Sequence, residues 1–489
     1  MERMSAGRGE SVKNLLRGLR QGAVNGILLV AAGNAALLIA KALTWLVVPR
    51  ILGVVEYGYY KTFTLYLVYV MLLHFGFPDG ILLIYGGQNY GRINQMEFRS
   101  NTRFFTVFQI IVSAFIIGIS LCLCQGMRCF IFCMIGLDGL FVNLATYYKF
   151  ISQAVMRFKE YTLRNVMQAV MQIGVVVIII FLKKLDILEP NGAFYILCIV
   201  LIDAILLVWY MKTYSDITFG RVGSVKRQFS KIKKIFMKGI LLTISFQVAH
   251  LVFFLDSQMV EMLFDVETYS LYAFAYSIAN MITVVVSAIA TVMFPSLKRL
   301  NTEDAVSKFP ALMATISVIV FFLLASYFPL SAFIRWFLPD YAAALDYLQI
   351  IMPGLALTSC INMIIFTYYK VLNRLKQYLY IALAMLLTGG ILNGAGYILF
   401  REPIAFSIAS IMTLLIWYIC SAAYLFQNFH MKWVKNFAYV FLEMMIFYTL
   451  DRVLDGGWKS MFTYFFSFMA VTIFIYKRDI GYLLNRFRK

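Results

Sequence analysis

Polar side chains recur at three- and four-residue spacing within segments that are otherwise strongly apolar. The longest series is Tyr269, Tyr272, Tyr276, Asn280, Thr283, Ser287 and Thr291. The segment before it carries Thr243, Gln247, His250, Ser257, Gln258 and Glu261. Because helical positions three and four residues apart lie on one face, each series predicts a helix with one polar stripe. Such stripes suit hydrogen bonding to a polar solute.

Two segments near the N-terminus repeat this pattern more weakly, and each contains a lysine. One carries Asn34, Lys41 and Thr44, and the other carries Tyr57, Tyr60, Lys61, Thr64 and His74. Either lysine could bind a phosphate or carboxylate in a cavity, or extend its ammonium group to the membrane surface. The stripes together predict substrate contacts from Asn34, Lys41, Thr44, Tyr60, Lys61, His74, Gln247, His250, Tyr272, Tyr276 and Asn280.

Three aspartates inside apolar segments are candidates for carrying a coupling ion. Asp138, Asp203 and Asp256 could bind a proton or sodium, or serve as hydrogen-bonded structural groups. Asp256 lies off the polar face of its own segment, which predicts a partner within the same half of the chain. The histidines and cysteines lack the spacing of a metal site, so neither a metal nor a cofactor is expected.

The composition is that of an integral membrane protein. Hydrophobic residues make up 62% of the 489 residues and charged residues 14%, against about 25% charged in soluble domains. A span needs about 20 apolar residues. The apolar runs predict fourteen spans, at 23–49, 58–83, 104–124, 129–149, 166–182, 193–211, 239–260, 270–294, 309–330, 343–369, 378–399, 404–426, 437–454 and 460–476.

The distribution of basic residues predicts the orientation. With a cytoplasmic N-terminus, 33 of the 43 Lys and Arg residues lie in cytoplasmic segments, as the positive-inside rule requires. The outer loops contain Arg50, Arg128, Lys183, Lys184, Arg335, Arg401, Arg452 and Lys459. Both termini are therefore expected in the cytoplasm. The net charge of +19 is explained by this face, which attracts anionic lipids and gives no reason to expect nucleic acid binding.

The chain is expected to be an all-α polytopic protein of two related halves. The predicted parts are a cytoplasmic tail (1–22), a six-helix bundle (23–212), a basic amphipathic linker on the inner leaflet (213–238), a second six-helix bundle (239–426) and two additional helices with a basic tail (427–489). Six spans per half make the bundles parallel repeats. The polar stripes of spans one, two, seven and eight would line one central cavity.

No motif of an enzyme accompanies these spans. A phosphate-binding loop of the G-x-x-x-x-G-K-[ST] type does not occur, and no histidine has a recognisable catalytic motif around it. The outer loops are too short to hold a catalytic domain. A transporter is therefore expected.

Several segments resemble the polysaccharide transporters, the Wzx-like oligosaccharide flippases of the multidrug, oligosaccharidyl-lipid and polysaccharide exporter superfamily. They are LGVVEYGYYKTFTLYLVYV with FGFPDGILLIYG, ETYSLYAFAYSI with VMFPSLKRL, and FLPDYAAALDYLQIIMPGLAL with YYKVLNRLKQYLYI. The resemblance implies two six-helix bundles around a cavity, alternating access driven by an ion gradient, and the cytoplasmic membrane of a bacterium. It also implies an undecaprenyl-diphosphate-linked oligosaccharide as substrate, with glycan-assembly proteins as candidate partners.

Two other functions remain open on the sequence. An ion-coupled exporter of small molecules would have the same architecture, and acidic residues would dominate its cavity. A membrane scaffold that transports nothing would not need polar stripes in equivalent helices of both halves, because these stripes are costly in a bilayer. The flippase, with Lys41 and Lys61 as the nearest cations for the diphosphate, is the first hypothesis.

Overall fold

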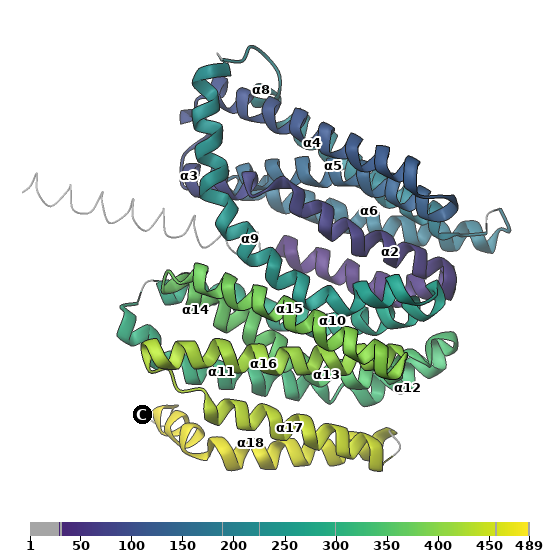
Figure 1. Cartoon of the computed structure of the whole chain (residues 1–489), viewed down its shortest axis with the longest axis vertical. Helices are drawn as coiled ribbons and strands as arrows, with labels where there is room; N and C mark the ends of the chain where they lie inside the picture. The colour runs from purple at the N-terminus through teal and green to yellow at the C-terminus, as the bar shows by residue number, and fades with distance from the viewer. Residues whose placement is uncertain are drawn as a thin grey trace, which may run out of the picture. The chain divides into compact units, whose positions relative to one another are not determined.

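The computed structural model describes residues 29, 32–187, 189–223, 225–298, 300–454 and 457–487, and within them all regular structure is helical. The predicted tail at 1–22 lies outside these residues. The first half contains helix Ala32–Leu52, α2 (Val54–Met71), η1 (Leu72–His74), α3 (Phe77–Tyr85), η2 (Tyr90–Arg92), α4 (Gln95–Leu123), α5 (Gly126–Ala154), α6 (Phe158–Lys184), α7 (Gly192–Thr213) and α8 (Ser215–Thr218) (Figure 1).

The second half begins with the longest helix of the described chain. Its elements are α9 (Val225–Leu263), α10 (Val266–Lys298), α11 (Thr302–Leu324), α12 (Tyr327–Phe337), η3 (Pro339–Tyr341), α13 (Ala344–Ser359), the π-helix η4 (Cys360–Ile365), α14 (Phe366–Val371), α15 (Leu375–Phe400), α16 (Pro403–Phe429), α17 (Val434–Val453) and α18 (Gly457–Phe487).

Every predicted span overlaps a helical segment of the described chain, although positions 23–28, 30 and 31 of the first predicted span lie outside the described residues. Eleven of these helices are long and apolar enough to cross a membrane, or twelve when the bent pair α2 and α3 counts as one span. The two remaining predicted spans correspond to α10 and α17. α17 is less apolar because it carries Lys435, Glu443, Asp451 and Arg452. The all-helical, multi-spanning fold class is confirmed.

The chain forms two compact units. Of the described residues, the first unit contains those up to Ile51 together with Phe63–Thr243, and the second contains Leu52–Thr62 and the chain from Ile244 onward. α2 and α9 each carry the chain from one unit to the other. The parallel relation of two six-helix bundles stays a prediction.

The first unit is built around α5, which packs against α3, α4 and α7. Its core is rich in aromatic side chains: Phe77 stacks on Phe105 with ring centroids 5.0 Å apart, and Tyr148 stacks on Tyr210 and Tyr214, each at 6.0 Å. Stacked aromatic pairs contribute about 0.5–1.5 kcal/mol beyond the area that they bury. The core therefore relies on ring packing as well as on aliphatic burial.

The predicted linker at 213–238 differs from the structure. α9 begins at Val225 and continues without a break into span seven. Among the described residues of the predicted linker, the four-residue α8 is the one helix that lies wholly within it. Ile232 and Ile235 are 6% and 1% exposed and belong to the aromatic core of the first unit. The amphipathic pattern is therefore real, but its apolar face packs mainly against protein and not against the inner leaflet. Phe229 is the exception, because it is 60% exposed.

The second predicted span is bent. α2 and α3 meet at an angle of 51°, and the turn between them contains Phe75 and Gly76, both with positive φ. The buried His74 stabilises this turn, since its Nδ1 accepts a hydrogen bond from the Gly76 N–H at 3.0 Å. α10, which the sequence pairs with this segment, is continuous.

The second unit is organised around α13, which packs against α10, α11, α16 and α17. Gly354 leaves room for the Ile411 side chain of α16, because a Cβ on Gly354 would lie 2.3 Å from the Cδ1 of Ile411. α13 then passes into η4, a π-helix in which backbone hydrogen bonds join residues five positions apart. Such π-helical turns are frequent at functional sites.

A backbone crossing in the first unit gives a testable prediction. A Cβ on Gly239 of α9 would lie 1.9 Å from the carbonyl oxygen of Gly76, so Gly239→Ala must separate α9 from α3. We expect the substitution to cost about 1–3 kcal/mol and to lower the apparent melting temperature of the purified protein. Gly394→Ala, where no atom lies within 4 Å of the added Cβ, is the matched control. Equal melting temperatures for both variants would contradict this account.

Candidate functional site

The polar residues of helix Ala32–Leu52 have protein partners in the first unit. The Asn34 side-chain oxygen accepts hydrogen bonds from the Tyr161 hydroxyl and the Asn165 amide, both at 2.9 Å. Thr44 donates to the carbonyl of Lys41 at 2.8 Å. Two of the predicted substrate contacts are thus hydrogen-bonded within the protein, to α6 and to the helix backbone.

Lys41 belongs to a cluster of charged groups in the first unit. Its side chain is exposed on this unit and interacts electrostatically with Lys149 and Asp203. The Asp203 carboxylate accepts a hydrogen bond from Gln168 at 3.2 Å and interacts with the charge of Asp138. The structure therefore brings together Lys41, Asp203 and Asp138, which the sequence placed on spans one, six and four.

Asp138 differs from Asp203 and Asp256 because its carboxyl group accepts no hydrogen bond from a described residue. It is completely buried, and neither carboxylate oxygen has a hydrogen-bond partner among the described residues. A buried acid without a partner is costly and is a functional candidate by default. The pair Asp138 and Asp203 could hold a proton or a small cation, and Lys41 interacts electrostatically with Asp203.

The predicted contacts at the start of α2 lie in the second unit. The Lys61 ammonium group lies 5.2 Å from the ring centre of Tyr57 and 5.7 Å from that of Tyr60, a cation–π arrangement. The Tyr57 ring is buried against Tyr341 at 5.8 Å. Lys61 is thus held by aromatic rings and is half-buried.

Asp256 is at the centre of a hydrogen-bonded group within the second unit. Its carboxylate accepts hydrogen bonds from the Ser257 N–H at 2.7 Å, from the Tyr272 hydroxyl at 2.9 Å and from the Tyr276 hydroxyl. The Ser410 hydroxyl is a fourth partner. This group joins α9, α10 and α16. The sequence predicted a partner for Asp256 in its own half, and that prediction is confirmed.

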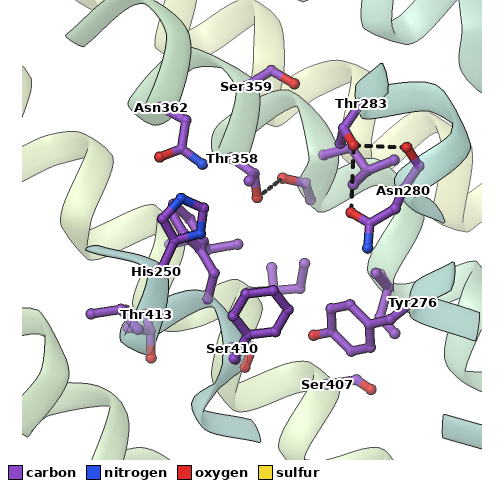
Figure 2. A pocket seen from close by; sticks show the side chains of 18 of the residues that line it. His250, Tyr276, Asn280, Thr283, Thr358, Ser359, Asn362, Ser407, Ser410 and Thr413 are labelled. Atoms are coloured by element: carbon purple, nitrogen blue, oxygen red, sulfur yellow. Dashed lines mark hydrogen bonds between the residues drawn. The ribbon is translucent and has the colours of Figure 1, made fainter. Parts of the chain in front are cut away.

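A cavity of about 260 Å³ lies beside this group, inside the second unit. α9, α10, α13, η4 and α16 form its walls. Figure 2 shows its polar lining, which consists of His250, Tyr276, Asn280, Thr283, Thr358, Ser359, Asn362, Ser407, Ser410 and Thr413. The apolar lining includes Phe253, Phe254 and Leu355. The described lining contains no Asp, Glu, Lys or Arg, so the cavity suits an uncharged polar group.

The structure places the predicted residues of spans seven and eight in different environments. His250, Tyr276 and Asn280 line the cavity. Tyr272 is buried behind it and is held by Asp256. Gln247 is half-buried outside the lining. Ser287 and Thr291 have side chains outside the described part.

The sequence analysis missed the contributions of spans ten and twelve. Thr358, Ser359 and Asn362 come from the α13–η4 segment, and Ser407, Ser410 and Thr413 come from α16. The three- and four-residue spacing of these polar side chains is a sequence signal that indicates one polar face on each segment. Among the described residues no cluster of His, Cys, Asp and Glu could hold a metal ion.

The two buried aspartates give opposite predictions for the same substitution. Asp256→Asn should lower the apparent melting temperature, because an amide NH₂ group cannot accept the hydrogen bonds that the carboxylate accepts, a loss of about 1–3 kcal/mol. Asp138→Asn should leave the melting temperature unchanged or raise it, since no hydrogen bond is lost and a buried acid is removed. Thermal unfolding of the purified variants measures both. An equal loss of stability in the two variants would refute this difference.

Comparisons with known proteins establish the fold. No family model and no curated protein matches the sequence. Among solved structures, the inward closed lipid II flippase MurJ matches with a TM-score of 0.66 and 14% identity, over 95% of this chain and 100% of that one. An inward-facing MATE multidrug resistance transporter of the MOP superfamily matches with a TM-score of 0.58 and 12% identity, over 80% and 94%.

A third match is a MOP superfamily transporter from Pyrococcus furiosus whose binding pocket has reversed polarity. Its TM-score is 0.51 and its identity 12%, over 82% of this chain and 94% of that one. The matched structures are those of a flippase and of transporters. The chain therefore has the fold of the MOP superfamily transporters, as its sequence predicted.

Proposed function

We propose that this protein is a flippase that moves a polyprenyl-diphosphate-linked oligosaccharide across the cytoplasmic membrane of a bacterium. The proposed mechanism is alternating access, in which the polar head enters from the cytoplasm, the polyprenyl tail stays in lipid, and the head is released outside. The product would supply surface polysaccharide synthesis. The protein would act as a transporter and not as an enzyme.

The extent of the structural match carries this proposal. The similarity to the lipid II flippase covers 95% of this chain, whereas the similarity to the MATE and Pyrococcus transporters covers 80% and 82%. The twelve spans of the two predicted bundles end at residue 426 of 489. A match over 95% of the chain must therefore include residues beyond these twelve spans. Fold likeness to a protein that carries a lipid-linked substrate supports, at a coarse level, a substrate of the same kind here.

The chemistry of the two units supports the same proposal. In the first unit, Lys41 provides a cation for the substrate diphosphate, because an ammonium group is an effective phosphate binder. In the second unit, the uncharged lining of the cavity suits hydroxyl groups. Asp138 and Asp203 are the proposed carriers of the coupling proton or sodium ion. Asp256, whose oxygens are already hydrogen-bonded, is the weaker candidate.

An ion-coupled exporter of small molecules is the second candidate function. The buried acids of the first unit favour it, and two of the matched structures are transporters of that superfamily. A non-transporting scaffold explains less, because Asp138 would be a stability cost without a compensating role.

Complementation of a gene deletion tests the flippase. Without this protein, lipid-linked repeat units should accumulate on the cytoplasmic side while surface polysaccharide is lost, and the wild-type gene should reverse both effects. Lys41→Ala should reduce translocation at least tenfold at unchanged membrane protein levels, because the diphosphate loses its counter-charge. Lys41→Arg should retain most activity, and Lys184→Ala, on an exposed lysine of the same unit, should retain all of it.

The outcomes separate the candidate functions. If the deletion strain has normal surface glycan and increased sensitivity to cationic drugs, the flippase proposal is wrong and the exporter is supported. Full complementation by Lys41→Ala would remove this lysine from the substrate site while leaving the flippase in place.

A further inference from the structure

We propose that the cavity of the second unit binds a single uncharged sugar ring of the transported glycan. This assignment rests on the proposed flippase function and adds to it a defined place for the sugar. A sugar ring combines hydroxyl groups that donate and accept hydrogen bonds with apolar C–H faces. The cavity offers a complement to each of these features.

The rim of hydroxyl and amide groups provides the hydrogen bonds. Asn362 extends from η4 toward His250 on one side of the cavity, and Asn280 and Tyr276 lie on the other side (Figure 2). The Ser359 hydroxyl is buried and has no hydrogen-bond partner among the described residues. Its oxygen is enclosed by the protein, so the hydrogen bonds to a ligand are assigned to Asn362, Asn280 and Tyr276.

Asp256 fixes the direction of two of these groups. Tyr276 donates its hydroxyl proton to the carboxylate, and Ser410 interacts with the same carboxylate. Because the Tyr276 proton is engaged, its oxygen can only accept a further hydrogen bond. The Tyr276 hydroxyl therefore presents its oxygen to the cavity as an acceptor. A ligand hydroxyl that donates there can accept from the amide of Asn362 or Asn280.

Aromatic side chains provide the apolar surface. Phe253 lines the cavity and stacks on the buried Trp417 with ring centroids 5.0 Å apart. Phe254 and His250 also line the cavity, and the centroids of their two rings lie 6.2 Å apart. Aromatic rings beside polar groups are the arrangement that accommodates the C–H face of a sugar.

Size and charge exclude other ligand classes. The volume of about 260 Å³ is below the roughly 300–1,000 Å³ of pockets for drug-sized ligands, so it matches one ring and not an oligosaccharide. A diphosphate would need cations, and a bare metal ion would need carboxylates. The described lining residues include neither Lys or Arg nor Asp or Glu. The uncharged lining thus selects a neutral, hydroxyl-rich ligand.

Binding of sugars to the purified full-length protein in lipid nanodiscs tests the proposal. The probes are the methyl glycosides of glucose and of N-acetylglucosamine, and the readout is Trp417 fluorescence. This fluorescence should respond to a ligand because Trp417 stacks on Phe253, which lines the cavity. We expect saturable binding of at least one glycoside. Trp417→Phe should abolish the saturable signal, which would assign it to this cavity and not to the other five tryptophans.

Three variants identify the binding residues. Asn362→Leu should weaken sugar binding at least tenfold, because it replaces the amide by an apolar group of similar size. Thr358→Val is the milder variant and should weaken binding several-fold; it removes a cavity hydroxyl that bonds to the Gly354 carbonyl of its own helix at 3.2 Å. Thr388→Val removes the same kind of bond, to the Ala384 carbonyl, from a residue outside the cavity lining. It should bind sugar as the wild type does.

The possible failures are distinguishable from one another. Saturable binding that survives both cavity variants would place the sugar elsewhere and overturn the proposal. Absence of sugar binding in a protein that complements the flippase deletion would also overturn it, while the proposed function would stand. Binding of tetraphenylphosphonium in place of sugars, with no glycan defect in the deletion strain, would overturn both.

Discussion

A polar side chain inside a membrane span loses its hydration and must be compensated by the protein or by a ligand. This constraint determines most of the polar contacts in the structure. Asp256 is compensated within the protein, by hydroxyl groups of α10 and α16 and a backbone N–H of its own helix. Asp138 and Ser359 are not compensated by any described residue, and each belongs to a group for which we propose a role.

The two units meet this constraint with different chemistry. The first unit contains charged groups on neighbouring helices, with Lys41 and Lys149 near Asp203 and Asp138. The cavity of the second unit contains amides and hydroxyls without a charged residue in its described lining. A substrate with a charged diphosphate and uncharged sugars contains both kinds of group.

α9 shows how one amphipathic pattern serves two purposes. Its first part buries Ile232 and Ile235 in the aromatic core of the first unit, at a crossing where Gly76, Gly80 and Gly239 allow the backbones of α3 and α9 to approach closely. Its second part contributes His250 to the cavity of the second unit. The helix is continuous between these parts. One continuous helix therefore contributes both to the core of the first unit and to the cavity of the second.

The sequence by itself determined the membrane class and the helical segments, because apolar runs of about 20 residues have no other stable arrangement in a bilayer. Helical periodicity also identified His250, Tyr276 and Asn280 as members of a polar face. Only the tertiary structure decided that Tyr272 turns toward Asp256 and that Asn362 joins the cavity. Such contacts depend on the rotation and packing of helices far apart in the chain, which the periodicity of one segment does not specify.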